Sequence, residues 1–430
     1  MPSYTSLPGF RDFYPADLFV RQHIMETWRA VSQLYGFEEY DGPPLEPLDL
    51  YIEKSGEEIV DQLYSFEDKG GRAVALRPEM TPTFARMVGA RASGMKKPIR
   101  WFSMPQLFRY ERTQRGRLRE HFQWNVDIVG EAAESADAEV LAVGLEALRR
   151  LGLGPDDVVA RYSDRRLLEA LLERLGVERT RLLSVYAAID KLGREREETT
   201  RDRLRAAGLA AETVDRVLVL FHTQGLDALR AQHGRDTAVG PALDRLAGYG
   251  DALAALGFGD WIAFDLRIVR GLAYYTGPVF EIFDRRGELR ALCGGGRYDA
   301  LLRTVSASDL PACGFGMGDV VLTELLAELG RLPAYAPVID FFIVAVTEAE
   351  RALQLELAGR LRRAGRSVAY SFRAGGVRKQ FGEADARGAR HVVVLGPDEV
   401  AAGAAVVREM ATGEERTVGL GEIGAPETPP

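Results

Sequence analysis

A change of character in the middle of the chain most constrains how it can fold. Residues 166–258 are rich in Leu, Ala, Arg and Glu at helical spacing and carry few strand signals. Strand-like runs lie on both sides of this stretch, at residues 73–77, 98–104, 107–111, 122–130, 261–269, 279–283, 289–293 and 313–317. The pattern predicts a strand-rich domain that is interrupted in sequence by a helical insertion.

Helical patterns and a change of rhythm divide the rest of the chain. Residues 18–35 predict an amphipathic helix that ends at Gly36, residues 135–150 predict one that begins at Ser135, and a third is expected near 319–329. After a break at 330–337, strand patterns at 341–346, 367–371 and 391–395 alternate with helix patterns at 348–364 and 377–387. This alternation predicts a compact α/β module. A length of 430 residues agrees with about three domains.

Composition excludes several classes of protein. The chain is 46% hydrophobic and 27% charged, which rules out a disordered, collagen-like or disulfide-scaffold protein. Cys293 and Cys313 are the only cysteines, which fits a reducing compartment and predicts a cytoplasmic location. The N-terminus has no signal-peptide pattern, and no run approaches the ~18 apolar residues of a membrane span, so no membrane partner is expected. A net charge of −8 argues against a basic coat for nucleic acid, so only local arginine clusters can indicate anion binding.

The arginine-rich segment 108–119 is the first candidate site. It follows a predicted strand and holds five arginines in eleven positions: Arg109, Arg112, Arg115, Arg117 and Arg119. Guanidinium groups bind phosphate in a bidentate manner and stay charged at any working pH. The cluster therefore suits a polyanion such as ATP or an RNA 3′ end, although a solvated charged hairpin tip would explain it as well.

Three shorter motifs accompany this segment. They are LRPEMT at 76–81, RGLAYYTG at 270–277 and CGGGRYD at 293–299. Taken singly, each has an ordinary structural explanation: a turn before a helix, a hairpin turn with aromatic packing, and a bulge. The five histidines show no metal-ligand spacing, although His121 lies near the arginine-rich segment, and no GxxxxGK[ST] loop is present.

Taken together, these motifs resemble histidyl-tRNA synthetases, a family of class II aminoacyl-tRNA synthetases. LRPEMT resembles the family's amino-acid-binding LRPE-x-T, and FRYERTQRGRLREHFQWNVDIVG resembles its motif 2. RGLAYYTG resembles the histidine-specific RGLDYYT signature, and GGGRYD follows at a similar spacing. The helix at 18–35 resembles motif 1, which builds the family's dimer interface. The combination is far more specific than any one piece.

The resemblance implies an α+β fold with four parts. A class II catalytic domain, in which helices flank an antiparallel sheet, would occupy residues 1–165 and 259–330. The helical insertion would occupy 166–258, and an α/β anticodon-binding domain 335–430. The implied activity is that of a histidine–tRNA ligase. Histidine and ATP, with Mg²⁺, would give histidyl-adenylate, and the histidyl group would pass to tRNA-His; a homodimer is expected.

The resemblance also implies roles for individual residues. The expected ATP contacts are Arg109, Glu111, Arg117 and Arg270, with Arg109 and Arg270 as the catalytic cations. The expected histidine contacts are Glu79, Thr81, Gln123, Asp127, Tyr274 and Tyr275. An imidazole presents one donor and one acceptor, which a carboxylate and a phenol can match. Arg112 and Gln114 are expected at the tRNA acceptor end, and no protein metal ligand is predicted.

The chain departs from the family pattern at three positions. Ala273 replaces the aspartate of RGLD, and Asp127 replaces a glutamate on the imidazole side. Val321 stands where motif 3 usually has an arginine that binds ATP. The alternative from another class is a histidine-sensing regulatory subunit of ATP phosphoribosyltransferase. That paralogue usually lacks the C-terminal domain and has eroded signatures.

Overall fold

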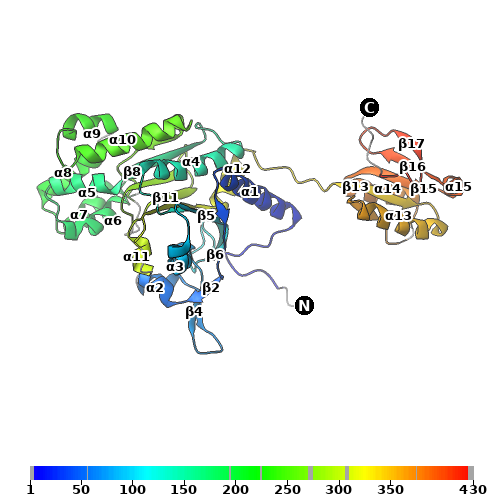
Figure 1. Ribbon diagram of the computed structural model, residues 1–430, viewed down its shortest axis with the longest axis horizontal. Helices are drawn as coiled ribbons and strands as arrows, with labels where there is room; N and C mark the ends of the chain where they lie inside the picture. The colour runs from blue at the N-terminus through cyan, green and yellow to red at the C-terminus, as the bar shows by residue number, and fades with distance from the viewer. Residues whose placement is uncertain are drawn as a thin grey trace. The chain divides into compact units, whose positions relative to one another are not determined.

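The structure is a computed structural model that describes residues 4–55, 57–192, 195–222, 225–269, 275–305, 309–373 and 375–424. The chain divides into two compact units, Met1–Pro333 and Ala334–Pro430 (Figure 1). The second begins within the predicted break, and each unit is treated separately below.

The first unit is built on a mixed sheet. Within the described residues the sheet has nine strands, in the order β1-β5-β7-β12-β11-β10-β8-β9, with β6 paired to β7. The strands are β1 (Glu38–Glu39), β5 (Ile99–Ser103), β6 (Gln106–Phe108), β7 (Glu120–Val129), β8 (Val158–Asp164), β9 (Ile262–Phe264), β10 (Pro278–Asp284), β11 (Cys293–Arg297) and β12 (Ala312–Gly318). The central pairs are antiparallel, whereas β1 joins β5 and β9 joins β8 in parallel. The expected α+β class with helices flanking a sheet is confirmed, with parallel pairs added at both edges.

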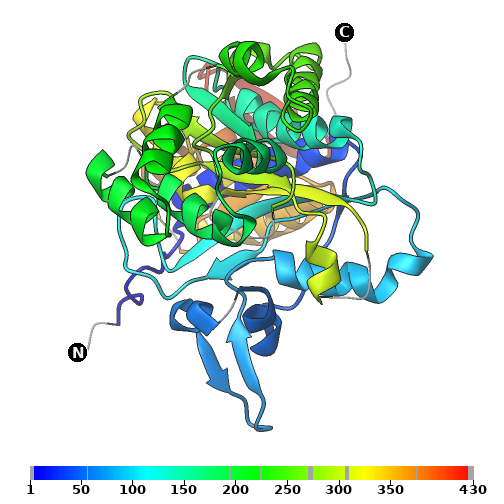
Figure 2. The same cartoon turned by 90° about the vertical axis from the view of Figure 1, so that its left-hand side faces the viewer.

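Helices cover one face of this sheet. The helix α4 (Glu134–Arg150) packs on β7 and β12, and α10 (Gly240–Ala255) packs on α4 (Figure 2). Trp28 of α1 (Pro15–Leu34) stacks on Trp124 of β7 with ring centroids 5.7 Å apart. The larger core therefore lies between these helices and the sheet. On the opposite face, a second buried cluster joins α3 (Thr81–Arg91) to β5, β7 and β12.

The predicted helical insertion lies between β8 and β9. Its helices are α5 (Arg165–Arg174), α6 (Leu182–Ile189), α7 (Glu197–Ala206), α8 (Ala211–His222), α9 (Leu226–His233) and α10. Their buried leucines and valines belong to the same core cluster as α4. The remaining elements of the unit are β2 (Leu45–Pro47), α2 (Asp49–Ser55), β3 (Ser65–Glu67), β4 (Ala73–Leu76), α3 (Thr81–Arg91), α11 (Leu301–Val305) and α12 (Asp319–Glu328). The exact domain boundaries inside this unit stay predictions.

The second unit is a five-stranded sheet between two helices. Its order is β14-β13-β15-β16-β17, formed by β13 (Ile339–Ala345), β14 (Val368–Tyr370), β15 (Ala389–Leu395), β16 (Ala404–Glu409) and β17 (Glu415–Gly419). Alternate residues of β13 pack against α13 (Arg351–Arg363) on one face and α14 (Val377–Ala386) on the other. The short helix α15 (Pro397–Ala401) precedes β16, and the sequence reading had not anticipated β16 and β17.

Four local expectations were wrong in detail. Ala133, not Ser135, occupies the N-cap of α4, and no side chain caps that end. The strand expected at 289–293 instead begins at Cys293 and contains all three glycines, because β10 and β12 pair with them on both sides. The strand expected at 261–269 is only three residues long, and the one expected at 107–111 ends at Phe108. Within the described chain, no helix combines the length and apolar character of a membrane span.

Candidate active site

The face of the sheet opposite α4, which we call the open face, has glycine on its two central strands. Gly314 of β12 lies opposite Asp127 of β7, and Gly316 lies opposite Asn125. On β11, Gly296 and Gly294 lie opposite those two glycines. Side chains alternate between faces along a strand, so these glycines share one face with Asp127. The result is a floor without side chains, on which a ligand can lie directly against the backbone.

The first two of these glycines are required by the polar side chains beside them. A β-carbon on Gly314 would overlap Asp127 Oδ1 and lie 2.6 Å from the Tyr298 hydroxyl oxygen. One on Gly316 would lie 2.8 Å from Gln123 Cδ and 3.0 Å from its Nε2. Heavy atoms this close to a β-carbon must move. The glycines thus leave room for Gln123 and Asp127 to lie over the sheet.

Asp127 forms the polar end of this floor. Its carboxylate is buried and accepts a hydrogen bond from the Tyr298 hydroxyl. Tyr275 is also buried, and its ring lies edge-on to that of Tyr298, with centroids 6.5 Å apart. Burial, and then the charge of Asp127, raise the pKa of Tyr40 well above its usual value, so Tyr40 stays a neutral phenol. This end of the floor therefore combines one carboxylate with phenols, a set that can both accept from and donate to an imidazole.

Tyr298 is the residue that the sequence reading missed. It is part of the quoted GGGRYD motif, but the spacing alone could not show that its hydroxyl reaches Asp127. Its neighbour Arg297 points to the other face, where its guanidinium binds Asp137 of α4 with Nε–Oδ1 at 2.9 Å. Burial raises the pKa of Asp137 to about 6, although the charge of Arg297 opposes that shift.

The segment that carries Glu79 and Thr81 is held in place by Arg77. The buried Arg77 guanidinium donates to Asp41 at 2.8 Å and to the carbonyl oxygens of Gly42 and Gln106 at 2.7 and 3.1 Å. Glu79 follows in the turn, and Thr81 is the first residue of α3. Both are partly exposed, next to the open face.

Arg109 links this segment to the arginine-rich hairpin. Its Nε donates to the Pro78 carbonyl oxygen at 2.9 Å, and its backbone N–H donates to Arg119 at 2.8 Å. The guanidinium is therefore oriented beside Glu79 by a contact that uses only one of its five donors. Such an orientation makes Arg109 suited to clamp an anion on the open face.

The rest of the hairpin forms its own contacts. Glu111 and Arg117 form a salt bridge, with Arg117 Nη2 2.8 Å from Glu111 Oε1. A tight turn at 114–117 closes with reciprocal backbone hydrogen bonds between Gln114 and Arg117, and Gly116 at φ 69° takes the left-handed conformation there. Arg112 and Gln114 are exposed. Arg270 and Tyr274, which complete the predicted set, lie outside the described residues.

His121 shares the open face with Gln123 and Asp127. Burial, and then the charges of Arg109 and Arg11, lower its pKa to about 3. A histidine whose folded pKa lies below its unfolded value of about 6.5 is neutral in the folded protein at pH 6–8. It therefore offers a flat, uncharged ring beside two arginines.

This neutrality predicts how activity depends on pH. If the chain has the ligase activity that its motifs lead us to expect, we expect the pH profile of its ATP–pyrophosphate exchange to be the same for His121→Phe and wild type between pH 6 and 8, because His121 has no proton to lose in that range. The stability contribution has the opposite sign to that of a paired histidine: it is full above pH ~6.5 and declines as the pH falls from there toward 3. A wild-type profile that bends near pH 6.5 and flattens in the variant would contradict this assignment.

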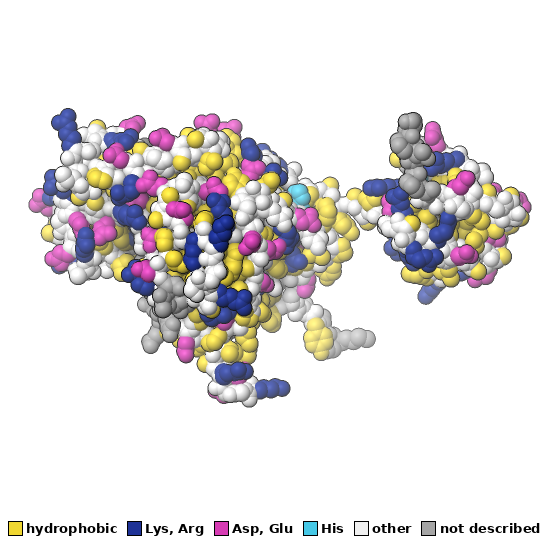
Figure 3. Space-filling view, viewed as in Figure 1, with side chains coloured by type: hydrophobic (Ala, Val, Ile, Leu, Met, Phe, Trp, Pro, Cys, Tyr) yellow, Lys and Arg dark blue, Asp and Glu magenta, His cyan; other side chains and the backbone are white. Residues whose placement is uncertain are grey.

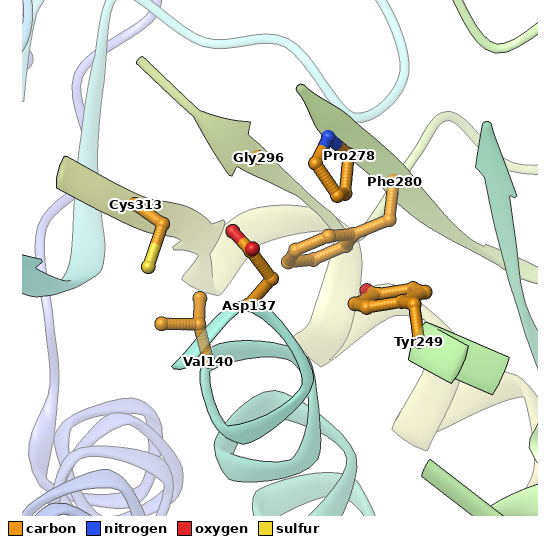
Figure 4. Close-up of a pocket in the computed structure, with 7 residues that line it drawn as sticks. All are labelled: Asp137, Val140, Tyr249, Pro278, Phe280, Gly296 and Cys313. Carbon is orange, nitrogen blue, oxygen red and sulfur yellow. The ribbon is translucent and has the colours of Figure 1, made fainter. Parts of the chain in front are cut away.

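Two pockets lie away from this face. One is on the helix-covered side of the sheet, where Figure 4 shows Asp137, Val140, Tyr249, Pro278, Phe280, Gly296 and Cys313 around it. Its charged lining residue, Asp137, forms a buried salt bridge with Arg297, which joins α4 to β11 and gives the pocket a structural role.

The other pocket is in the second unit and holds about 330 Å³. It is lined by Ser371, Phe372, Arg373, Gly375, Lys379, Gln380, Glu383 and Arg387. The Phe372 side chain is 80% exposed, and its carbonyl oxygen accepts from Arg351 at 2.9 Å. Figure 3 shows Lys and Arg side chains gathered on the visible face of this unit. An exposed aromatic ring among cations is the arrangement that binds single-stranded nucleic acid.

Comparisons with known proteins identify the family of the chain. A family model described as Histidyl-tRNA synthetase matches residues 9–319, and one described as Anticodon binding domain matches 340–425. A histidine–tRNA ligase of Opitutus terrae is 43% identical over 431 residues, covering 99% of this chain and 98% of that protein. The chloroplastic/mitochondrial histidine–tRNA ligase of Arabidopsis thaliana is 39% identical, covering 96% and 85%. The crystal structure of histidyl-tRNA synthetase from Nostoc sp. PCC 7120 superposes with a TM-score of 0.81 at 25% identity, covering 99% and 98%.

The sheet, the arginine-bearing hairpin and these matches define a class II aminoacyl-tRNA synthetase. Within that class, the chain belongs to the histidyl-tRNA synthetase family.

Proposed function

We propose that this chain activates histidine with ATP and transfers the histidyl group to tRNA-His. The observation that carries the proposal is the glycine floor with Asp127 and Tyr298 at one end and Arg109 beside it. A flat substrate can lie on the floor with its imidazole at Asp127, and its carboxylate then faces Arg109. Chain-long similarity to histidine–tRNA ligases supports the same reaction.

The predicted site residues are assigned either to histidine or to ATP. We assign the imidazole to Asp127, Tyr275 and Tyr298, with Tyr274 nearby, and the α-amino group to Glu79, Thr81 and Gln123. The histidine carboxylate attacks the α-phosphorus of ATP, and the bond to pyrophosphate breaks. Arg109 and Arg270 stabilise the negative charge that spreads over the phosphate, because prearranged cations need no reorganisation as the charge develops.

The hairpin binds the remainder of ATP and the tRNA end. Arg117 is assigned to the outer phosphates, and Glu111 to the adenine side or to a metal ion. For Arg117 to reach phosphate, its salt bridge to Glu111 must be exchanged for the ligand. The exposed Arg112 and Gln114 are assigned to the acceptor end of tRNA-His.

Mg²⁺ fits this arrangement as a companion of ATP. Among the described residues no cluster of three His, Cys, Asp or Glu side chains is placed to hold a metal, but Glu111 supplies one carboxylate next to the phosphate-binding arginines. Mg²⁺ bound to nucleotides commonly uses one or two carboxylates together with phosphate oxygens. When bound, the ion would neutralise phosphate charge.

A homodimer in the cytoplasm completes the proposal. The strand β1 ends the sheet, and α1 exposes Phe19 and Leu34 at 37% and 60%. An open sheet edge beside apolar helix residues suits association of two copies. Sedimentation equilibrium should give twice the chain mass of 47.4 kDa.

Histidine-dependent ATP–pyrophosphate exchange tests the activity directly. The pure protein should exchange label only when histidine is present, and it should charge tRNA-His. Histidine binding without exchange would overturn the ligase proposal and favour the regulatory-subunit alternative.

The pocket of the second unit is assigned to an unpaired base of the tRNA. We expect Phe372→Ala to raise the KM for tRNA about tenfold, since stacking on an aromatic ring contributes ~1–3 kcal/mol per base. Exchange without tRNA should be unchanged. Leu355→Ala is the matched control, because Leu355 is 51% exposed in the same unit but does not line the pocket. Equal tRNA KM values for Phe372→Ala and wild type would refute the assignment.

A further inference from the structure

Residues 7–13, which we call the strap, lie along the stem of the arginine-rich hairpin. The Gly9 carbonyl oxygen of the strap accepts from the Arg119 N–H at 3.0 Å. The Arg119 carbonyl oxygen in turn accepts from the Arg109 N–H at 2.8 Å. Two consecutive backbone hydrogen bonds therefore connect the strap to Arg109, one of the two cations that are assigned to the α-phosphate.

The strap approaches the hairpin so closely at Gly9 that only glycine fits there. Gly9 has φ 84°, in the left-handed region. A β-carbon on it would lie 2.8 Å from Thr113 Cγ2 and 2.8 Å from Arg119 Cγ. The next residue, Phe10, has its ring centroid 6.4 Å from that of Phe108, the last residue of β6. The strap is therefore seated on the hairpin by close packing as well as by hydrogen bonding.

Arg11 fixes the strap to two further elements. Its Nε donates to Glu120 Oε1 at 2.6 Å, and its Nη1 lies 2.9 Å from Asp319 Oδ2. Glu120 is the first residue of β7, directly after the hairpin, and Asp319 is the first residue of α12. Both carboxylates are buried, with side chains 1% and 2% exposed. One guanidinium thus joins the strap, the hairpin stem and α12.

Each of the two carboxylates also binds a strand of the hairpin stem. Glu120 Oε2 accepts from Gln106 Nε2 of β6 at 3.0 Å, and Asp319 Oδ1 accepts from the Phe122 N–H of β7 at 2.9 Å. Burial raises the pKa of Asp319, and the charge of Arg11 opposes that shift. Buried carboxylates stay charged only when they are paired. Arg11 therefore keeps both carboxylates in the form that binds the hairpin stem.

We propose that Arg11 is a positioning residue for histidine activation: it holds the strap on the hairpin and so fixes the backbone from which Arg109 reaches the α-phosphate. The inference rests on the proposed function, because Arg109 acts in that reaction. Side chains alternate along β7, so Glu120 lies on the face opposite to His121 and the open face. Arg11 therefore acts through the backbone of the hairpin and not by contact with a substrate.

The kinetics of ATP–pyrophosphate exchange by Arg11→Met test this role. Methionine keeps an unbranched stem but removes the guanidinium. The kcat should fall about tenfold, less than in Arg109→Ala, because Arg109 is still present but is held less precisely. The KM for histidine should stay at the wild-type value, since the contacts of Arg11 are with the hairpin stem and α12. Arg11→Lys, which keeps one charge, should recover part of the lost rate.

A double variant separates positioning from a general loss of structure. In the Arg109→Ala background, Arg11→Met should change kcat by less than about twofold, because the side chain that Arg11 positions is gone. A general loss of structure would instead lower kcat by the same factor in both backgrounds. An unchanged kcat in Arg11→Met, or an equal fall in both backgrounds, would overturn the inference.

Gly9→Ala disturbs the strap while both carboxylates keep their partner. The added methyl group should push the strap away from Arg119 and lower kcat about tenfold, again only when Arg109 is present. Gly257→Ala is the matched control: Gly257 has φ 86°, but a β-carbon there meets nothing within 4 Å. It therefore carries the same backbone strain at a distance from the hairpin. A wild-type kcat in Gly9→Ala, or an equal fall in Gly257→Ala, would also contradict the role of the strap.

Amide hydrogen exchange tests the strap without any need for activity. The backbone amides of Arg109 and Arg119 should exchange faster in Arg11→Met than in wild type, whereas those of β5 should keep their wild-type rates. Unchanged amide exchange in the hairpin of Arg11→Met would refute the role of Arg11. Wild-type protein that shows no histidine-dependent ATP–pyrophosphate exchange would instead refute the proposed function, so the two failures can be told apart.

Discussion

Arg109→Ala should reduce the histidine-dependent exchange rate by at least about 10²-fold, because loss of one prearranged charge at the reacting group costs about 2.7–4 kcal/mol. The structure gives the reason for the prearrangement: Nε is held on the Pro78 carbonyl oxygen at 2.9 Å, so the guanidinium is already oriented beside Glu79. The rate of ATP–pyrophosphate exchange at saturating ATP and histidine measures the effect. Arg270→Ala, on the opposite side of the α-phosphate in the proposed scheme, should have an effect of similar size.

Arg72→Ala provides the control for a general change in charge. Arg72 is an exposed arginine in the turn between β3 and β4, and it pairs with Asp68 of the same turn. Its removal should leave exchange at the wild-type rate. An Arg109→Ala variant that exchanges within threefold of wild type would remove Arg109 from the catalytic role.

The second large effect is expected at Gly314. Gly314→Ala should abolish measurable histidine binding, because the added methyl group would occupy the space of Asp127 Oδ1 and crowd the Tyr298 hydroxyl. Asp127→Ala should give the same loss, since it removes the carboxylate that we assign to the imidazole. When a site and its substrate can no longer form a buried hydrogen bond, the affinity for the substrate falls by a large factor. Isothermal titration with histidine, and separately with ATP, measures both affinities.

The ATP titration separates a local effect from misfolding. Both variants should bind ATP with near-normal affinity, because the arginines of the hairpin lie at the other end of the floor. Gly94→Ala is the matched glycine control: a β-carbon there meets nothing within 4 Å. Normal histidine affinity in Asp127→Ala would refute the imidazole assignment, and normal affinity in Gly314→Ala would refute the steric argument for the floor.

Local signals in the sequence predicted much of the fold. The helices α1, α4 and α12 and the run of insertion helices follow from apolar spacing along the helix, which each segment carries by itself. Most of the wrong predictions concern strands, because pairing with neighbouring strands decides where a strand begins and ends. The glycines of β11 read as a loop after a strand, yet β10 and β12 pair with them and make them strand. Glycine has little strand preference of its own, so only its neighbours can assign it.

The candidate site divides in the same way. Residue types and motif resemblance predicted Arg109, Asp127 and their companions as site residues, because the chemistry of phosphate and imidazole limits which side chains can serve. The contact of Tyr298 with Asp127 could not be found in that way, because the two residues are 171 positions apart in the sequence.

The sequence by itself determined the order of helical and strand-rich segments and the break before the C-terminal unit, and it supplied the residue types of the candidate site, since these depend on short-range spacing and side-chain type. The tertiary structure decided which glycines form the floor and which phenol binds Asp127. The physical reason is that strand register and loop placement are set by pairing between distant segments, and one residue of slip would turn every side chain to the opposite face.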